Sequence, residues 1–332
     1  MKVVITGGAG FLGQLLIRAL CARGRLTAAG GNEREIGQIV AIDQAHTHRL
    51  HVDERVGYVV GDISRAALLK HVLGTDTDSV FHLAAAVSGA AEADFDLGMR
   101  VNLDGTRALL EVCRAQRAPV KLVFASSVAV FGGALPAVVD DDTAATPQSS
   151  YGVQKLVGEL LVREFTRKGF LDGRSVRLPT IVVRPGKANA AASSFASGII
   201  REPLAGLEAV CPVGADTALW LLSPPAAIEA LLRAHELPRE RWQEVTAGRA
   251  LNLPGLTVTV AQMLDALRAV GGHSAVERVR FAPDARIAAI VEGWPARFDP
   301  ARALRLGFAA DHDIDEVVRG YAQMQATLPG AP

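Results

Sequence analysis

Short apolar segments alternate with amphipathic segments along the first half of the chain. The runs at 3–5, 39–43, 58–60, 79–85 and 121–127 are rich in β-branched and other apolar residues, the composition of buried parallel strands. Between them, apolar residues recur at i, i+3 and i+4, as they do on helices with one apolar face. This alternation predicts an α/β fold with a doubly wound parallel sheet that binds ligands at the carboxyl ends of its strands.

The second half of the chain has a different pattern, in which apolar helices surround short strands. We expect residues 1–175 to form the main sheet domain, including the helix that begins near residue 150. Residues 176–332 should form mainly a smaller mixed α/β lobe that covers the site, with some strands returning to the main sheet. The apolar helices predicted in this lobe cover 224–237, 259–270 and 314–324.

A glycine-rich turn joins the first predicted strand to the first predicted helix. Gly7, Gly10 and Gly13 follow one another at three-residue spacing directly after the strand. Glycines let the backbone turn tightly and approach phosphate groups, and a helix N-terminus offers free N–H groups and the positive end of its dipole. The pattern predicts the pyrophosphate site of a dinucleotide in a Rossmann domain; a purely steric use of glycine is the alternative.

Acidic residues follow the second and third predicted strands. Asp43 stands where Rossmann domains place a carboxylate that accepts hydrogen bonds from the adenosine ribose and repels the extra phosphate of NADP; capping a turn is its alternative role. Gly13 and Asp43 are 30 positions apart, and we attribute this long gap to a loop over 24–37. Asp62 can accept from the adenine amino group or cap the following helix, and both roles stay open.

A serine, a tyrosine and a lysine carry the expected chemistry. Tyr151 and Lys155 lie at i and i+4 on one helix face, and Ser127 ends the strand at 121–127. An ammonium group near a phenol stabilises the phenolate, so we expect Lys155 to lower the pKa of Tyr151. Tyr151 would then take the proton of a substrate hydroxyl while Ser127 holds that oxygen.

Composition and charge argue against several other classes of protein. Lys and Arg together number 35, as do Asp and Glu, so the net charge is zero and no basic field favours nucleic acid or anionic lipid. No apolar run approaches the ~20 residues of a membrane span. Three scattered cysteines suit a reducing cytosol. We therefore expect a cytoplasmic protein without nucleic-acid or membrane partners.

Two polar clusters are expected to lie in solvated loops. His46, His48 and His51 have no carboxylate or cysteine at ligand spacing on a defined element, so no metal site is expected. The acidic run 140–142 precedes the helix of Tyr151 and is expected to be a solvated loop.

The motifs in combination resemble the extended short-chain dehydrogenase/reductase superfamily. They are Thr6-Gly7-Gly8-Ala9-Gly10-Phe11-Leu12-Gly13, Asp62-Ile63, His82-Leu83-Ala84-Ala85, Asn102, Ser126-Ser127 and Tyr151-Gly152-Val153-Gln154-Lys155. The resemblance implies bound NAD and a catalytic set of Ser127, Tyr151 and Lys155. The NAD-binding residues that it implies are Gly7, Gly10, Phe11, Leu12, Gly13, Asp43, Asp62, Ile63, Leu83, Ala84, Ala85, Asn102, Tyr151, Lys155, Leu178 and Pro179.

Further segments are similar to the D-erythronate dehydrogenase family. They cover 82–89, 91–96 and 183–195, and this resemblance extends over nearly the whole chain. It implies NAD-dependent oxidation at C2 of a four-carbon sugar acid, which gives 2-dehydro-D-erythronate.

A small acidic substrate agrees with the residues near position 184. Arg184 can hold a carboxylate through two parallel hydrogen bonds, and a surface position beside a Pro-Gly turn is its alternative. Nearby hydroxyl and amide groups could bind the substrate's hydroxyls, with ordinary loop or capping roles as the alternative. The expected substrate-binding residues are Ser88, Ser126, Ser127, Tyr151, Thr180, Arg184 and Asn189.

Other functions on the same scaffold stay open. A nucleoside-diphosphate-sugar epimerase or dehydratase is less expected because Phe131 stands where these enzymes more commonly have tyrosine. A uronate dehydrogenase and a non-catalytic NAD-binding sensor are further alternatives. Trp294 and Phe298 are expected to pack the smaller lobe rather than to contact a ligand.

A homodimer is expected from two helical segments. The segments 95–117 and 151–168 carry apolar residues on more than one face. Relatives pair through these two helices, which implies a four-helix interface between two copies of the chain.

Overall fold

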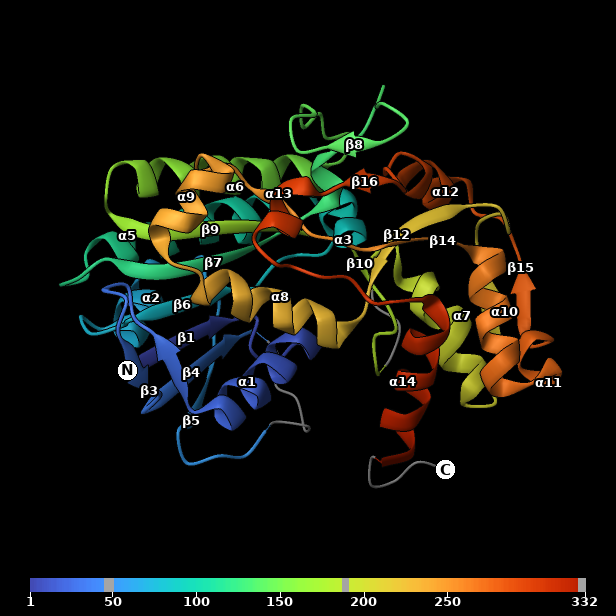
Figure 1. Cartoon of the computed structure of the whole chain (residues 1–332), viewed down its shortest axis with the longest axis horizontal. Helices are drawn as coiled ribbons and strands as arrows, with labels where there is room; N and C mark the ends of the chain where they lie inside the picture. The colour runs from blue at the N-terminus through green and yellow to red at the C-terminus, as the bar shows by residue number, and fades with distance from the viewer. Residues whose placement is uncertain (45–50, 187–190, 328–332) are drawn as a thin grey trace.

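The computed structural model describes residues 1–44, 51–186 and 191–327, and its largest element is a seven-stranded sheet (Figure 1). The strand order is β13-β9-β7-β6-β1-β4-β5, and all neighbouring strands are parallel. This is the doubly wound order of a Rossmann fold, as predicted. The strands are β1 (Lys2–Thr6), β4 (Gln38–Asp43), β5 (Val56–Val60), β6 (Ser79–His82), β7 (Val120–Ser127), β9 (Leu171–Leu178) and β13 (Leu251–Asn252).

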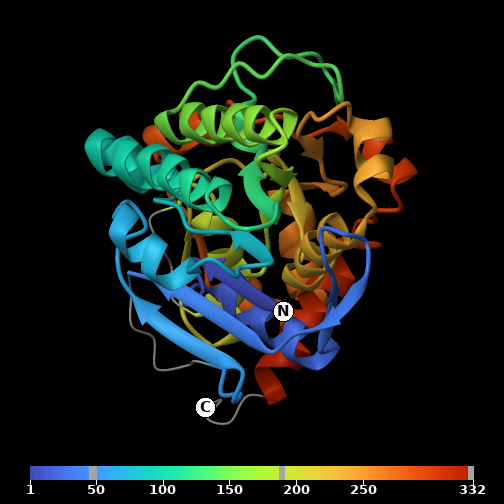
Figure 2. The same ribbon diagram turned by 90° about the vertical axis from the view of Figure 1, so that its left-hand side faces the viewer.

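Helices cover both faces of this sheet, which explains why its inner strands are buried along most of their length. Val3 and Ile5 of β1 pack in one apolar layer with α1 (Phe11–Arg23) and α8 (Pro224–Glu236). Val4 packs in the opposite layer. Figure 2 shows two of the helices on that side, α5 and α6, lying together along the sheet. The helices of the second layer are α2 (Ala66–Leu73), α5 (Gly105–Arg114) and α6 (Ser150–Arg167).

The smaller lobe has sheets and an apolar core of its own, as expected for a mixed α/β unit. In Figure 1 it lies beside the large sheet, on the right. Its core includes Phe195, Ile199, Met263 and Leu267. The strands are β10 (Thr180–Ile181), β12 (Ala218–Leu222) and β14 (Leu256–Thr259) in one sheet, and β11 (Ala209–Cys211) and β15 (Val279–Phe281) in another. The helices are α7 (Ser194–Leu204), α10 (Val260–Gly271), α11 (His273–Val276), α12 (Ala285–Glu292) and α14 (Ile314–Thr327).

Segments from the second half return to the main sheet. Strand β13 pairs with β9, and α13 (Ala301–Arg305) packs beside β13 and α9 (Arg239–Thr246). Short helical elements between the strands of the first half are α3 (Ser88–Ala93), α4 (Phe95–Gly98), a π-helix (Met99–Asp104) and a 3₁₀ turn (Val128–Val130). Among the described helices, none is both long enough and apolar enough to cross a membrane.

Two expected loops have more structure than the sequence pattern indicated. The expected loop over 24–37 contains an antiparallel hairpin of β2 (Arg25–Thr27) and β3 (Glu33–Glu35). All three residues of β3 are charged and exposed, so the sequence lacks the alternation of apolar and polar residues that would predict a strand. The acidic run 140–142 is not simply a solvated loop. Strand β8 (Val139–Asp140) pairs with β16 (Phe298–Asp299), and Asp141 accepts a hydrogen bond from the backbone N–H of Arg302 at 2.7 Å.

Candidate active site

The glycine turn between β1 and α1 is packed too closely for larger residues. Gly7 has φ 73°, in the left-handed region, and its N–H donates to the carbonyl of Ile42 at 2.8 Å. A Cβ on Gly13 would lie 2.3 Å from the carbonyl oxygen of Gly7. In the described structure the first turn of α1 has no side-chain cap, so its N–H groups are available to an anion. The turn therefore fits a pyrophosphate.

Asp43 lies at the carboxyl end of β4, directly beside this turn. Its carboxylate accepts a hydrogen bond from the backbone N–H of Ala9 at 3.0 Å. That contact holds a negative charge next to the phosphate-binding turn, where the sequence predicted the ribose-binding acid. Asp43 and the following Gln44 both line the cavity described next.

A cavity of about 590 Å³ extends from the glycine turn to helix α6 and the segment after β10. Sites for small molecules and cofactors commonly measure about 300–1,000 Å³. The carboxyl ends of the central strands form much of its wall, where parallel sheets place their ligands. The expected site residues that line it are Gly7, Gly10, Phe11, Leu12, Gly13, Asp43, Ile63, Leu83, Ala84, Ala85, Ser88, Ser126, Ser127, Tyr151, Lys155, Leu178, Pro179, Thr180 and Arg184.

Ser127, Tyr151 and Lys155 come together at the end of the cavity opposite the glycine turn. Ser127 ends β7; its hydroxyl accepts from the backbone N–H of Ala129 at 3.1 Å and lies close enough to the Tyr151 hydroxyl to lower the pKa of that group. Tyr151 and Lys155 occupy the first turns of α6. Ser149 caps the N-terminus of this helix, because its side chain accepts from the N–H of Gly152 at 3.2 Å. The Lys155 ammonium donates to the carbonyl of Ala125 at 2.9 Å.

The electrostatics of this group differ from the expectation. Burial raises the pKa of Tyr151 to about 12, and the charge of Arg184 and the hydrogen bond from Ser127 oppose that rise. The Lys155 ammonium is bonded to the carbonyl of Ala125 and lies 5.7 Å from the centre of the Tyr151 ring, and its effect on the Tyr151 pKa stays a prediction. Burial lowers the pKa of Lys155 to about 8, and the charge of Glu159 opposes that fall.

Arg184 is a cation in the cavity wall rather than an ordinary surface residue. Its Nε donates to the carbonyl of Ile181 at 3.0 Å, and one terminal nitrogen donates to the Ser193 hydroxyl at 2.9 Å. These two contacts fix the plane of the guanidinium. Since its charge also lowers the pKa of Tyr151, Arg184 acts electrostatically on the same hydroxyl that Ser127 contacts.

Three expected site residues use their side chains to hold the wall in place. The Ser126 hydroxyl is buried and donates to Glu159 at 2.5 Å. The Ser88 hydroxyl accepts from the backbone N–H of Ala192 at 3.1 Å and so ties α3 to the segment before α7. The Asn102 side chain accepts from the backbone N–H of Ala86 and donates to its carbonyl. Ala86 lines the cavity, and Asn102 lies behind the lining that the described residues form.

A further expected residue, Asp62, is not part of the cavity wall that the described residues form. The Asp62 carboxylate accepts from the backbone N–H of Ser64 at 2.8 Å, and its neighbours Gly61 and Ile63 are the ones that line the cavity. Burial raises the pKa of Asp62, but the hydrogen bonds from Ser64 outweigh it and leave the pKa lowered. Asn189 lies outside the described residues.

The structure also places residues in the wall that the sequence reasoning missed. Trp294, expected only to pack the smaller lobe, lines the cavity as well as contacting the lobe's core. Ser193 was not missed: it is one of the hydroxyl groups expected near Arg184, and it lines the cavity there. Phe298 packs against Trp220 and Phe131, as expected. Gln44 also lines the cavity, and its place directly after Asp43 could have predicted this. Trp294 offered no such signal, because it is more than 100 positions from the other described residues that line the cavity.

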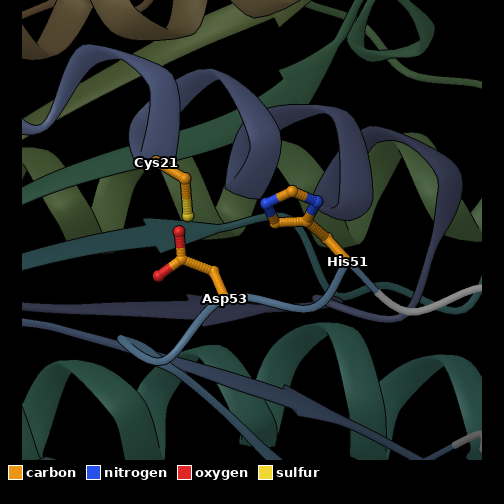
Figure 3. Close-up of side chains that lie close together, drawn as sticks. All are labelled: Cys21, His51 and Asp53. Carbon is orange, nitrogen blue, oxygen red and sulfur yellow. The ribbon is translucent and has the colours of Figure 1, made fainter.

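Cys21, His51 and Asp53 form a separate cluster beside α1 (Figure 3). One ligand atom from each lies within 4.8 Å of the others. However, Arg55 bonds both carboxylate oxygens of Asp53, at 2.9 and 2.7 Å, and also donates to the carbonyl of Cys21. Because a guanidinium competes with a metal ion for that carboxylate, we assign this cluster a structural role. His46 and His48 lie outside the described residues.

Comparisons with known proteins agree with this fold and site. Residues 3–220 match the NAD dependent epimerase/dehydratase family. The chain is 56% identical to the D-erythronate dehydrogenase of Cupriavidus necator over 97% of the chain and 98% of that protein. It is 44% identical to the D-erythronate dehydrogenase of Haemophilus influenzae over 97% of the chain and 99% of that protein.

Solved structures share the whole architecture. A nucleoside-diphosphate-sugar epimerase from Agrobacterium tumefaciens aligns with a TM-score of 0.86 and 39% identity, covering 97% of this chain and 94% of that one. A GalE-like L-threonine dehydrogenase from Cupriavidus necator aligns with a TM-score of 0.83 and 25% identity, covering 98% and 99%. The resemblance inferred from the motifs is confirmed: this chain belongs to the NAD dependent epimerase/dehydratase family, in the extended short-chain dehydrogenase/reductase branch.

Proposed function

We propose that this enzyme uses NAD to oxidise the C2 hydroxyl of D-erythronate to 2-dehydro-D-erythronate. The observation that carries the proposal is the group of Ser127, Tyr151 and the buried Lys155 at one end of the cavity, with the Arg184 guanidinium beside it. The high identity to two D-erythronate dehydrogenases supports the same substrate.

The residues at the other end of the cavity suit NAD. Gly7, Gly10 and Gly13 would hold the pyrophosphate there, and Asp43 the adenosine ribose. Lys155, at the reactive end, would hold the nicotinamide ribose. A Cβ at Gly7 would meet the backbone of Ala84 at 2.8 Å, so this cradle stays open only with glycine. Bound NAD supplies the hydride acceptor.

The side chains of the reactive end divide the remaining work. Tyr151 takes the proton from the C2 hydroxyl, and Ser127 orients that oxygen by hydrogen bonding. Arg184 binds the substrate carboxylate, since a guanidinium matches a carboxylate geometrically and in charge. Its charge also favours the phenolate of Tyr151, whose pKa burial raises to about 12. We place the NAD-binding domain at residues 1–175 and the substrate lobe mainly at 176–332.

The decisive experiment follows NADH formation by the wild type and by Tyr151→Phe. The wild type should reduce NAD with D-erythronate, and a screen of four- to six-carbon aldonates and uronates should rank that acid first. Tyr151→Phe should lose about 10²- to 10⁴-fold in kcat, the usual contribution of a general base, while binding NAD normally. Full turnover by this variant would overturn the assignment of Tyr151, and preference for a uronate would overturn the substrate.

A nucleoside-diphosphate-sugar epimerase is the second candidate, because the epimerase from Agrobacterium tumefaciens shares the fold and is 39% identical in sequence. Such an enzyme would isomerise a nucleotide sugar without net release of NADH. Incubation with nucleoside-diphosphate sugars, followed by product analysis, separates the two activities. Isomerisation with no NADH accumulating from any sugar acid would favour the epimerase.

The same chain is proposed to form a homodimer through α4, α5 and α6. Phe95 on α4 and Val153 and Leu160 on α6 are 61%, 47% and 54% exposed, which is unusual for large apolar side chains. Light scattering should give twice the chain mass, and a monomer mass would refute the dimer.

The three free cysteines support the proposal of a reducing, cytoplasmic location.

A further inference from the structure

A second, much smaller cavity lies directly behind the reactive end of the main one. It measures about 10 Å³, close to the space of one water molecule. Val128, Thr180 and Trp294 line both cavities, so these three side chains form the partition between them. Val128 follows Ser127 in sequence, and Thr180 precedes Ile181, whose carbonyl holds Arg184.

The partition therefore stands where the substrate's carbon chain would lie, and away from the adenosine end. Trp294 is its largest member and comes from the loop after α12, in the smaller lobe. Its indole packs against the apolar core of that lobe. Removing the indole would join the two cavities and lengthen the reactive end of the main one.

The far wall of the small cavity is rigid enough to leave that space open. Trp220 donates from its ring nitrogen to the carbonyl of Leu253 at 3.2 Å and packs at a tilt against Phe298 with ring centres 5.2 Å apart. Ala218 of β12 lines the small cavity only, within the described residues, and is held by pairing with Thr259 of β14. A side chain grown from Ala218 would therefore refill the space from behind.

We propose that Trp294 is the residue that sets the length of the sugar acid, by closing the reactive end against acids longer than four carbons. This inference rests on the proposed oxidation of a four-carbon acid. It makes the partition a specificity element rather than a catalytic one. Trp294→Ala should accept five- and six-carbon aldonates, because their additional CHOH groups can occupy the merged cavity.

The test compares kcat/KM for four-, five- and six-carbon aldonates in the wild type, Trp294→Ala, Trp294→Leu and Trp294→Phe. The ratio of six-carbon to four-carbon activity should rise at least tenfold in the Ala and Leu variants. It should stay near the wild-type value in Trp294→Phe, which keeps an aromatic wall. NAD affinity and thermal unfolding show that each variant is folded.

A refilling variant sharpens the test. Adding Ala218→Leu to Trp294→Ala should return the ratio towards the wild-type value, which a general loosening of the lobe would not do. An unchanged ratio in folded Trp294→Ala and Trp294→Leu, with a wild type active on the four-carbon acid, overturns this inference alone. A wild type inactive on every aldonate overturns the proposed function instead.

Discussion

Glu159 and Arg177 form an ion pair between helix α6 and strand β9, with two N–H···O contacts of 2.9 and 2.8 Å. The same carboxylate accepts from the hydroxyl of Ser126, the neighbour of Ser127 on β7. Glu159 also lies one helical turn after Lys155. One buried carboxylate therefore connects the strand that carries the serine to the helix that carries the tyrosine and lysine.

This relationship predicts a shift in the pH profile of Glu159→Gln. Burial lowers the pKa of Lys155 to about 8, and the charge of Glu159 opposes that fall. Without this charge the Lys155 pKa falls further, so Lys155 loses its proton at a lower pH. Because the Lys155 pKa lies below that of Tyr151, it sets the acidic limb of log kcat/KM against pH, and that limb should move to lower pH.

A matched control exists on the same helix. Glu164 pairs with Arg167 at the exposed surface of α6, and Glu164→Gln should leave the acidic limb where it is in the wild type. An unmoved limb in Glu159→Gln would show that the pKa of Lys155 does not depend on this carboxylate.

Glu159→Gln also removes one partner of the ion pair with Arg177, so it should lower the free energy of unfolding by about 3 kcal/mol.

Arg184 offers a prediction in the opposite direction of pH. Its charge opposes the burial that raises the pKa of Tyr151 to about 12. Arg184→Gln should raise that pKa further, and since it lies above the Lys155 pKa, the alkaline limb of the oxidation profile should move to higher pH. Arg184→Lys keeps the charge but cannot form two parallel hydrogen bonds with a carboxylate, so its profile should stay in place while KM for the acid rises about tenfold or more. A Gln variant with the wild-type alkaline limb would contradict this electrostatic role.

The parts of the site that sequence reasoning placed correctly are carried by local patterns. The turn from Gly7 to Gly13 sits between a strand and a helix that are contiguous with it, and Tyr151 and Lys155 share one helix. Interactions between distant segments left no such signal. Trp294 reaches the cavity from the second lobe. Asp142 forms ion pairs with Arg249 and Arg302, which are both more than 100 positions away in the sequence. The direction of the Lys155 ammonium likewise depends on Ala125, which only the folded sheet brings beside it.

Asp43 should determine the choice between NAD and NADP. Its carboxylate lies beside the glycine turn, where the 2′-phosphate of NADP would add negative charge. Asp43→Asn removes the repulsion and keeps an oxygen for the Ala9 N–H, so kcat/KM for NADP relative to NAD should rise roughly tenfold. Asp62→Asn is the control, since Asp62 lies outside the wall that the described residues form. An unchanged ratio in Asp43→Asn would exclude Asp43 as the discriminating group.

His235 should make the fold sensitive to mild acid. Its ring is buried between the Ser79 hydroxyl and the Glu236 carboxylate, each at 2.8 Å. Burial lowers the pKa of His235 to about 4, below the ordinary value of about 6.5 that the unfolded chain would have. The unfolded state therefore binds the proton first, so stability is complete above about pH 6.5 and declines as the pH falls towards 4.

Denaturant unfolding at pH 7 and pH 5 measures this loss. One histidine with this shift should lower the free energy of unfolding by about 2 kcal/mol between the two pH values. The buried His82, whose pKa burial lowers to about 3, acts in the same direction, so His235→Gln should remove only part of the loss. His273→Gln, at an exposed position, should leave the loss unchanged. If His235→Gln loses as much free energy of unfolding between pH 7 and pH 5 as the wild type does, proton uptake by His235 does not cause the loss.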